Sequence, residues 1–193
     1  ALRFPVQYVT RPNLDFRGFA GTIASGMVRQ GDKVRVLPSG RESTVTRIVT
    51  MDGDLDHAIA GQAITLTLAD EIDISRGDVI ARPDDLPGVA DQFEAVVVWM
   101  SDEPMLPGRP YWLKTGTKQV SATITEPKYK VNVNTLEHLA AKKLELNEIG
   151  ICNVSLDQAI ACDPYQQCRE TGSFIRIDRL TNATVGAGMI HFA

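Results

Sequence analysis

Hydrophobic and polar residues alternate over short stretches of this chain, and such stretches recur from one end to the other. Between residues 22 and 37 the alternation predicts two strands, at 22–29 and 33–37. The residues between them, Gln30-Gly31-Asp32, are typical of a tight hairpin turn, because glycine adopts backbone angles that other residues avoid. The pattern therefore predicts antiparallel β-structure.

The rest of the chain continues this pattern, with Gly, Pro and Asp separating segments rich in Val, Ile and Thr. Residues 163–169 have a helical signature, with Asp163 as N-cap and Pro164 at the first helical position. Residues 136–146 have a helical composition but weak periodicity. Short strands without long alternating helices predict an all-β protein made of barrels or sandwiches. Further strands are predicted at 4–9, 43–51, 63–68, 78–81, 93–99, 110–115, 118–130, 149–160, 173–180 and 186–192.

A domain boundary is predicted where the composition changes, at residues 82–88. The run Arg82-Pro83-Asp84-Asp85-Leu86-Pro87-Gly88 combines two prolines, a glycine and two acids, which is typical of a stiff polar linker. We therefore predict one β-barrel over residues 1–84, a linker over 85–88 and a second β-barrel over 89–193.

Composition and charge narrow the class of protein. Hydrophobic residues make up 44% and charged residues 23%, so a packed core can form. The net charge of −4 argues against a nucleic-acid partner, which needs a basic face. The chain has no signal-peptide pattern and no 18-residue apolar stretch, so we expect a cytoplasmic protein without a membrane partner. Its three cysteines lack a C-x-x-C spacing, which favours free thiols.

No catalytic, nucleotide-binding or metal site is predicted. The chain contains neither the phosphate loop G-x-x-x-x-G-K-[ST] nor the guanine-reading Asn-Lys-x-Asp. The acidic run 52–56 fails as a calcium loop, because His57 and Ala63 occupy the positions that need Gly and Glu. The histidines His57, His138 and His191 are scattered without a metal-ligand spacing.

Several stretches resemble the two β-barrel domains that follow the nucleotide-binding domain in translational GTPases. The glycine-rich run 17–40 and the runs 60–66 and 74–80 resemble the second domain. The runs 107–111 and 171–179 resemble the third domain. Residues 2–6 look like the first strand of the second domain, so the chain is expected to begin after the nucleotide domain. The resemblance implies two consecutive small β-barrels like domains 2 and 3 of elongation-factor-type GTPases.

Three further stretches resemble the GTP-hydrolysing large subunit of bacterial ATP sulfurylase, sulfate adenylyltransferase subunit 1. They are the runs 111–118, 146–150 and above all 178–190. The resemblance implies that the intact subunit binds GTP and Mg and pairs with a small catalytic subunit. Together they would make adenosine 5′-phosphosulfate from ATP and sulfate, driven by GTP hydrolysis. This chain alone is expected to bind no cofactor and to be inactive, since the nucleotide domain has no counterpart in it.

Other interpretations stay open. The barrels could belong to an elongation-factor-type GTPase that binds tRNA or the ribosome, or to a bifunctional form fused to adenylylsulfate kinase; a stand-alone enzyme is the most distant alternative. The resemblance implies that the barrels reorient as a rigid body when the switch loops of the nucleotide domain become ordered. The functional residues of the barrels are then expected at their interfaces with other domains or partners. Arg17, Arg76 and Arg179 flank the glycine-rich turns and are candidates for contact with the missing GTPase domain or a partner. Their alternative role is a solvated surface or a local ion pair.

Overall fold

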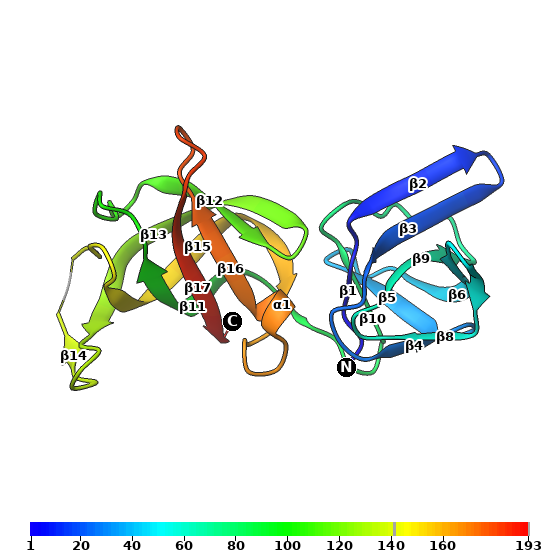
Figure 1. Cartoon of the computed structure of the whole chain (residues 1–193), viewed down its shortest axis with the longest axis horizontal. Coiled ribbons are helices and arrows are strands. Elements are labelled where there is room, and N and C mark those ends of the chain that lie inside the picture. The colour runs from blue at the N-terminus through cyan, green and yellow to red at the C-terminus, as the bar shows by residue number, and fades with distance from the viewer. Residues whose placement is uncertain (141, 193) are drawn as a thin grey trace. The chain divides into compact units, whose positions relative to one another are not determined.

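Strands make up nearly all of the regular structure in the computed structural model, which describes residues 1–140 and 142–192 (Figure 1). The chain divides into two units, Ala1–Gly88 and Val89–Ala193. The predicted all-β fold with two small barrels is confirmed. Residues 85–88, expected to be a linker, lie in unit 1, where the Asp85 carbonyl accepts a 2.6 Å hydrogen bond from the Arg3 guanidinium.

Unit 1 is built on one strongly curved antiparallel sheet. The sheet runs in the order β1 (Phe4–Pro5), β10 (Val79–Ala81), β5 (Lys33–Leu37), β6 (Glu42–Thr50), β9 (Ala63–Leu68), β3 (Phe16–Thr22) and β2 (Tyr8–Asn13). β7 (Gly53–Leu55) pairs with β6, while β4 (Met27–Arg29) and β8 (His57–Ile59) form a separate two-stranded sheet. The hairpin predicted between 22–29 and 33–37 is therefore wrong, because β4 pairs with β8 and β5 pairs with β6 and β10.

The predicted first strand, residues 4–9, is two strands that pair with different neighbours. The backbone N–H of Val6 donates to Asp78 O at 2.8 Å, whereas that of Gln7 donates to Ala20 O at 2.8 Å. The chain therefore leaves β10 and joins β3 between these two residues. A Cβ on Gly21 of β3 would lie 2.5 Å from the Pro5 carbonyl oxygen, so only glycine allows β1 to approach β3 this closely.

Unit 2 contains a closed barrel of antiparallel strands, because the pairing of β12 (Pro110–Thr115) with β13 (Lys118–Val131) joins the two ends of the strand order. The short strand β14 (His138–Leu139) pairs with the far end of β13. The barrel follows the order β12, β16 (Ser173–Ile177), β17 (Thr184–Phe192), β11 (Gly88–Trp99), β15 (Ile149–Cys162) and β13.

The predicted helix at 163–169 is wrong in position. The structure has a four-residue helix, α1 (Arg169–Gly172), and a turn before it. The Asp163 carboxylate accepts a 2.6 Å hydrogen bond from the buried Thr171 hydroxyl instead of capping a helix at Pro164. Residues 136–146 form β14 and turns, and residue 141 lies outside the described part. No helix in the described part of the chain is long and apolar enough to cross a membrane.

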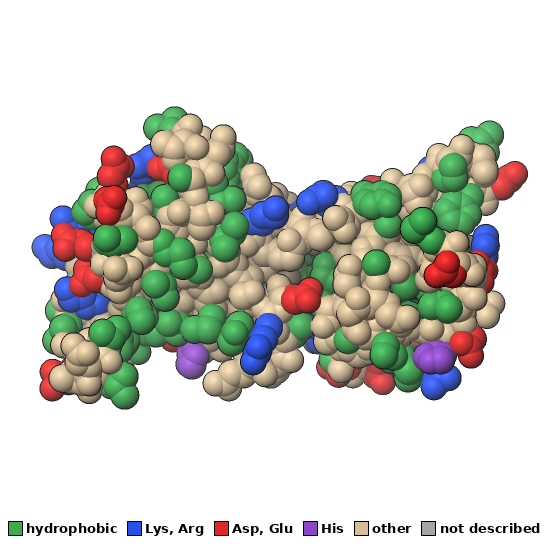
Figure 2. All heavy atoms as spheres, viewed as in Figure 1, with side chains coloured by type: hydrophobic (Ala, Val, Ile, Leu, Met, Phe, Trp, Pro, Cys, Tyr) green, Lys and Arg blue, Asp and Glu red, His purple; other side chains and the backbone are tan. Residues whose placement is uncertain are grey.

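Surface charges of both signs are interspersed in the view of Figure 2, where Asp and Glu side chains lie among the Lys and Arg side chains. Exposed ion pairs also occur between neighbouring strands, such as Arg47 with Asp54 at 2.7 Å. Exposed pairs of this kind contribute little to stability. The charge pattern on this face is that of an ordinary solvated surface.

An arginine lies inside the barrel of unit 2. Arg176 is fully buried on the inward face of β16, and its Cζ lies 4.7 Å from the centre of the Tyr111 ring. Its Nη2 donates a long 3.4 Å hydrogen bond to Ala122 O, while Nε and Nη1 have no partner among the described residues. Burial lowers the pKa of Arg176 to about 10. A buried charge with so few partners opposes folding.

We predict that Arg176→Met raises the free energy of unfolding of unit 2 by about 1 kcal/mol or more, because an apolar side chain of similar length removes the buried charge. Both tryptophans, Trp99 and Trp112, belong to unit 2, so urea unfolding followed by their fluorescence reports on this unit. Arg169→Met, at an exposed arginine, is the control and is expected to change little. A lower stability of Arg176→Met would show that the guanidinium is stabilising.

We predict that Gly188→Ala destabilises the same unit. Gly188 pairs with Phe174 across β17 and β16, and a Cβ on it would lie 2.2 Å from Phe174 Cζ. Relieving this overlap requires a shift of a buried ring, which costs about 1–3 kcal/mol. The same urea measurement checks it, with Ala187→Ser on the outward face of β17 as control. Equal midpoints for Gly188→Ala and the wild type would refute the prediction.

Candidate docking surface

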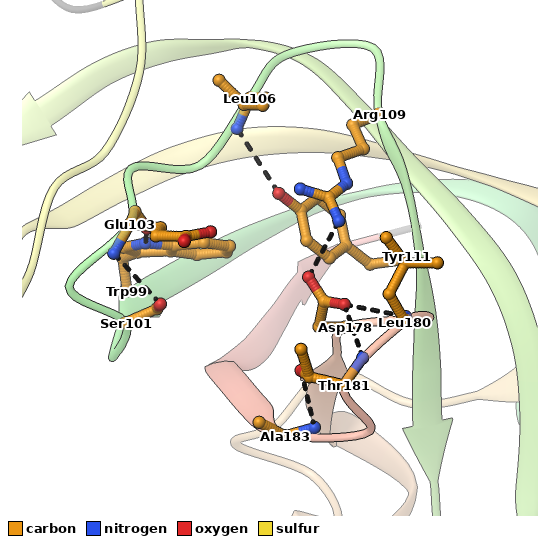
Figure 3. A network of polar contacts seen from close by, with 10 residues as sticks. All are labelled: Trp99, Ser101, Glu103, Leu106, Arg109, Tyr111, Asp178, Leu180, Thr181 and Ala183. Carbon is orange, nitrogen blue, oxygen red and sulfur yellow. Dashed lines mark hydrogen bonds and ion pairs between the residues drawn. The ribbon is translucent and has the colours of Figure 1, made fainter.

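The loop after β16 is organised by one carboxylate. Asp178 Oδ1 accepts hydrogen bonds from the backbone N–H groups of Leu180 and Thr181, at 2.8 and 3.0 Å (Figure 3). The Asp178 N–H donates to Ala183 O at 2.9 Å, which closes the loop. The N–H groups of Thr181 and Leu180 lower the pKa of Asp178, and Arg109 adds to the effect. The loop 178–183 is therefore held in one conformation.

Arg109 ties this loop to the segment that precedes β12. Its Nη2 lies 2.9 Å from Asp178 Oδ2, and its Cζ lies 5.3 Å from the centre of the Tyr111 ring. Figure 3 shows the guanidinium directed at the carboxylate beside this ring. The Tyr111 hydroxyl accepts a long 3.5 Å hydrogen bond from Leu106 N, and Trp99 Nε1 donates to Glu103 O at 2.6 Å. The β11–β12 connection is thus anchored along its length.

The Tyr111 ring connects the Arg109–Asp178 ion pair to the barrel interior. Its ring contacts Trp99 edge-on, with centroids 5.6 Å apart and an interplanar angle of 78°. The guanidinium groups of Arg109 and Arg176 both lie within cation–π distance of it. The position of the loop 178–183 therefore depends on side chains in the core.

Arg179, one of the three predicted contact residues, lies on the exposed side of this loop. Its Cζ lies 4.3 Å from the centre of the Trp112 ring, and its Nη1 lies 3.4 Å from Ser121 Oγ. Trp112 pairs with Ser121 on β13 and with Ile177 on β16, so it points outward from the barrel. No carboxylate among the described residues forms an ion pair with Arg179, which leaves its charge available to a partner.

A shallow groove of about 610 Å³ continues on the same outer face, across β11, β16 and β17. Lys114 lies on its rim and points to the same side of β12 as Trp112, two residues earlier. Arg169 and Glu170 of α1 complete the rim. The groove floor is mainly apolar and includes Val96, Val98, Ile175, Ala187 and Met189. We call Trp112, Arg179 and this groove the outer face of unit 2.

The other two predicted contact residues belong to unit 1. Arg17 lies on β3, half-buried, with its Cζ 5.5 Å from the centre of the Phe19 ring. Arg76 lies in the turn before β10 and donates from Nη1 to Gln7 O at 3.1 Å. No hydrogen bond, ion pair or ring contact joins these two arginines in the part of the chain that is described. Their contact role stays a prediction.

The geometry of the described residues gives little support for a metal site or a reactive thiol. No group of three or more His, Cys, Asp or Glu side chains among the described residues is placed to hold a metal ion; the side chain of His138 lies outside them. The predicted free thiols are confirmed, since Cys152, Cys162 and Cys168 are free and buried. Burial raises the pKa of Cys152 to about 12 and that of Cys162 to about 11, so both are protonated and unreactive at neutral pH.

The sequence analysis missed the residues that build this surface: Arg109, Tyr111, Arg176 and Asp178. One signal was available for Arg176. In the strand 173–177 its side chain falls on the same face as Phe174, and a charge at an inward position of an alternating strand is unusual. No sequence pattern predicts that Arg109 contacts Asp178, because 69 residues separate the two.

Two family models match the chain. The GTP-eEF1A C-terminal domain-like model covers residues 92–191, and the elongation factor Tu domain 2 model covers residues 20–81. Among solved structures, that of sup35 complexed with GDP superimposes with a TM-score of 0.89 over 99% of this chain and 47% of that chain. Its sequence identity is 16%, so this likeness concerns the fold.

Sequence relatives are much closer. Sulfate adenylyltransferase subunit 1 of Aeromonas hydrophila subsp. hydrophila is 59% identical over 98% of this chain. The bifunctional enzyme NodQ of Rhizobium sp. (strain N33) is 60% identical over 97% of it. The chain spans 40% of the first protein and 29% of the second. The chain belongs to the GTP-eEF1A C-terminal domain-like family, and over nearly its whole length it corresponds to part of sulfate adenylyltransferase subunit 1.

Proposed function

We propose that this chain is the non-catalytic double-barrel part of the GTPase subunit of ATP sulfurylase. The intact enzyme would form adenosine 5′-phosphosulfate from ATP and sulfate in sulfate assimilation, coupled to GTP hydrolysis. The observation that carries this proposal is the 59% identity over 98% of the chain to a subunit 1 protein of which the chain spans 40%. At this identity the chain is expected to have the same role as the corresponding part of that subunit.

Neither GTP nor Mg is assigned to the residues of this chain. The sequence has no phosphate loop, and the described side chains include no group of three or more that could hold a metal ion. In the proposal, nucleotide binding belongs to a GTPase domain elsewhere in the intact subunit. The barrels act through contacts that differ between nucleotide states, which is how binding energy at one site changes another.

In this proposal the outer face of unit 2 is the surface that meets the GTPase domain. Arg109 and Asp178 hold the loop 178–183 in place, so Arg179 and Trp112 are presented without further ordering. The apolar groove beside them offers buried area, and Lys114 and Arg169 on its rim favour an acidic edge on the partner. The small catalytic subunit is the second partner proposed for the assembly.

A bifunctional protein is the second candidate. The 60% identity to NodQ supports it, since a similar segment occurs in that bifunctional enzyme, and a fusion to adenylylsulfate kinase would leave the role proposed for the barrels unchanged. The elongation-factor alternative, with tRNA or the ribosome as partner, is less favoured, because the net charge is −4 and the charges on the face shown in Figure 2 are mixed. A tRNA gel-shift experiment with the purified chain separates it from the other two.

We expect Arg179→Ala in the intact subunit to weaken assembly or GTP-stimulated adenosine 5′-phosphosulfate synthesis by about 2–5-fold, the effect of losing one solvent-exposed ion pair with a partner. The measurement is product formation by the complex co-purified with the small subunit, with and without GTP. Arg41→Ala, an exposed arginine of unit 1, is the matched control.

Two outcomes count against the proposal at different levels. Unchanged assembly and unchanged GTP stimulation in Arg179→Ala would remove Arg179 from the contact surface. No synthesis by the wild-type complex, or saturable GTP hydrolysis by the purified chain alone that survives repurification, would overturn the proposed function itself.

We predict that the Asp178 carboxylate no longer stabilises the loop 178–183 in acid. The pKa of Asp178 is lower in the folded protein, so its contribution is present above the unfolded value of about 3.9 and is lost as the pH falls through the folded value. The gap in urea midpoint between wild type and Asp178→Asn should be widest near neutral pH and shrink below about pH 4. Asp91→Asn is the control, and a gap that stays constant down to pH 3 would contradict the prediction.

A further inference from the structure

Unit 1 contains a separate cleft of about 250 Å³, at the place where β3 and β9 stop pairing. Their register ends at Phe19 and Leu66, and beyond this pair the strands separate. The opening lies beside the β2–β3 turn, and the start of β3, the middle of β6 and the segment after β9 contribute its walls. The function proposed above does not use this cleft; Arg17, which lines it, is one of the predicted contact residues.

The cleft contains one guanidinium whose charge is not neutralised. Arg17 lines it, half-buried, and forms no ion pair with a carboxylate among the described residues. The other cation of the cleft, Arg47, is engaged by Asp54 through two hydrogen bonds of 2.7 and 2.9 Å. Glu71 is engaged by Arg11 at 3.3 Å. Arg17 is therefore the group that would attract a negative charge into the cleft.

A carboxylate with a fixed orientation lies in the same cleft. Asp70 Oδ2 accepts a 2.8 Å hydrogen bond from the Ser43 hydroxyl, and the Asp70 N–H donates back to the Ser43 oxygen at 3.1 Å. The hydroxyls of Thr46 and Thr67 line the wall and lie 2.6 Å apart. The carboxylate accepts one of these two hydrogen bonds, which fixes its orientation, so it is preorganised to accept a further one from a cation.

The charges in the cleft disfavour ligands that carry only one sign of charge. A phosphate, a sulfate or a nucleic-acid backbone would meet the carboxylates of Asp15, Asp70 and Glu71 in the same walls. A simple amine would meet the guanidinium groups of Arg17 and Arg47. A ligand that carries both charges avoids both repulsions. The volume of about 250 Å³ is also below the ~300–1,000 Å³ typical of sites for drug-sized ligands, which favours a ligand smaller than a nucleotide.

We propose that this cleft binds a small zwitterion of the α-amino-acid class. Its carboxylate lies against Arg17, its ammonium group against Asp70, and its apolar side chain against Phe16 and Leu68, which also line the cleft. The site would give the chain a small-molecule ligand that is independent of GTP, ATP and sulfate.

The test is a ¹H–¹⁵N NMR titration of the whole chain with L-valine. The expected result is saturable shifts of the backbone amides of Arg17, Thr46, Thr67 and Asp70. N-acetylvaline, which lacks the ammonium, and isobutylamine, which lacks the carboxylate, should each need at least about tenfold more ligand, because each loses one charged hydrogen bond. Inorganic phosphate should give no saturable shift.

Two variants connect the shifts to the proposed contacts. Arg17→Gln and Asp70→Asn should each weaken valine binding at least about tenfold, and Asp70→Asn keeps a side-chain oxygen for Ser43. Arg41→Gln, at an exposed arginine outside the cleft, should bind as the wild type does. Equal binding of N-acetylvaline or phosphate would identify an anion site and overturn the proposal, as would shifts that do not saturate. None of these outcomes bears on the sulfurylase proposal, whose readout is product formation by the intact complex.

Discussion

Closure of the second barrel is the constraint on which the candidate surface depends. β12 pairs with β13 from Pro110 opposite Thr123 to Thr115 opposite Lys118, and this pairing joins the two ends of the strand order. Once the ring is closed, each residue of β12 faces either the core or the solvent. Tyr111 and Leu113 are buried, whereas Trp112 is directed outward, where the Arg179 guanidinium lies over its ring.

The closed barrel also holds an energetically costly group in its core. Arg176 is a buried cation with few hydrogen bonds, yet it lies against the Tyr111 ring that Arg109 contacts as well. Arg109 in turn holds Asp178, and Asp178 holds the loop that carries Arg179. A chain of contacts thus runs from the barrel interior to the outer face. Proteins commonly retain unfavourable groups where a surface has a function.

The two units carry different kinds of candidate site. The outer face of unit 2 is broad, shallow and largely apolar, as expected of a surface that meets another folded domain. The cleft of unit 1 is small and lined by charges of both signs, which suits a small polar ligand. The 59% identity to a subunit 1 protein concerns both units, since it extends over 98% of the chain. Because the two candidate sites lie in different units, partner binding and ligand binding can be tested separately.

The sequence by itself determined the fold class, the family resemblance and most strands, because alternation with a period of two and glycine at turns are local signals. It also indicated free thiols, which the structure confirms. Only the tertiary structure decided where a strand changes partner, as between Val6 and Gln7, since pairing is not local. The same holds for Asp163, which bonds to Thr171 rather than capping a helix, and for Arg109 and Asp178, which meet across 69 residues because the barrel closes.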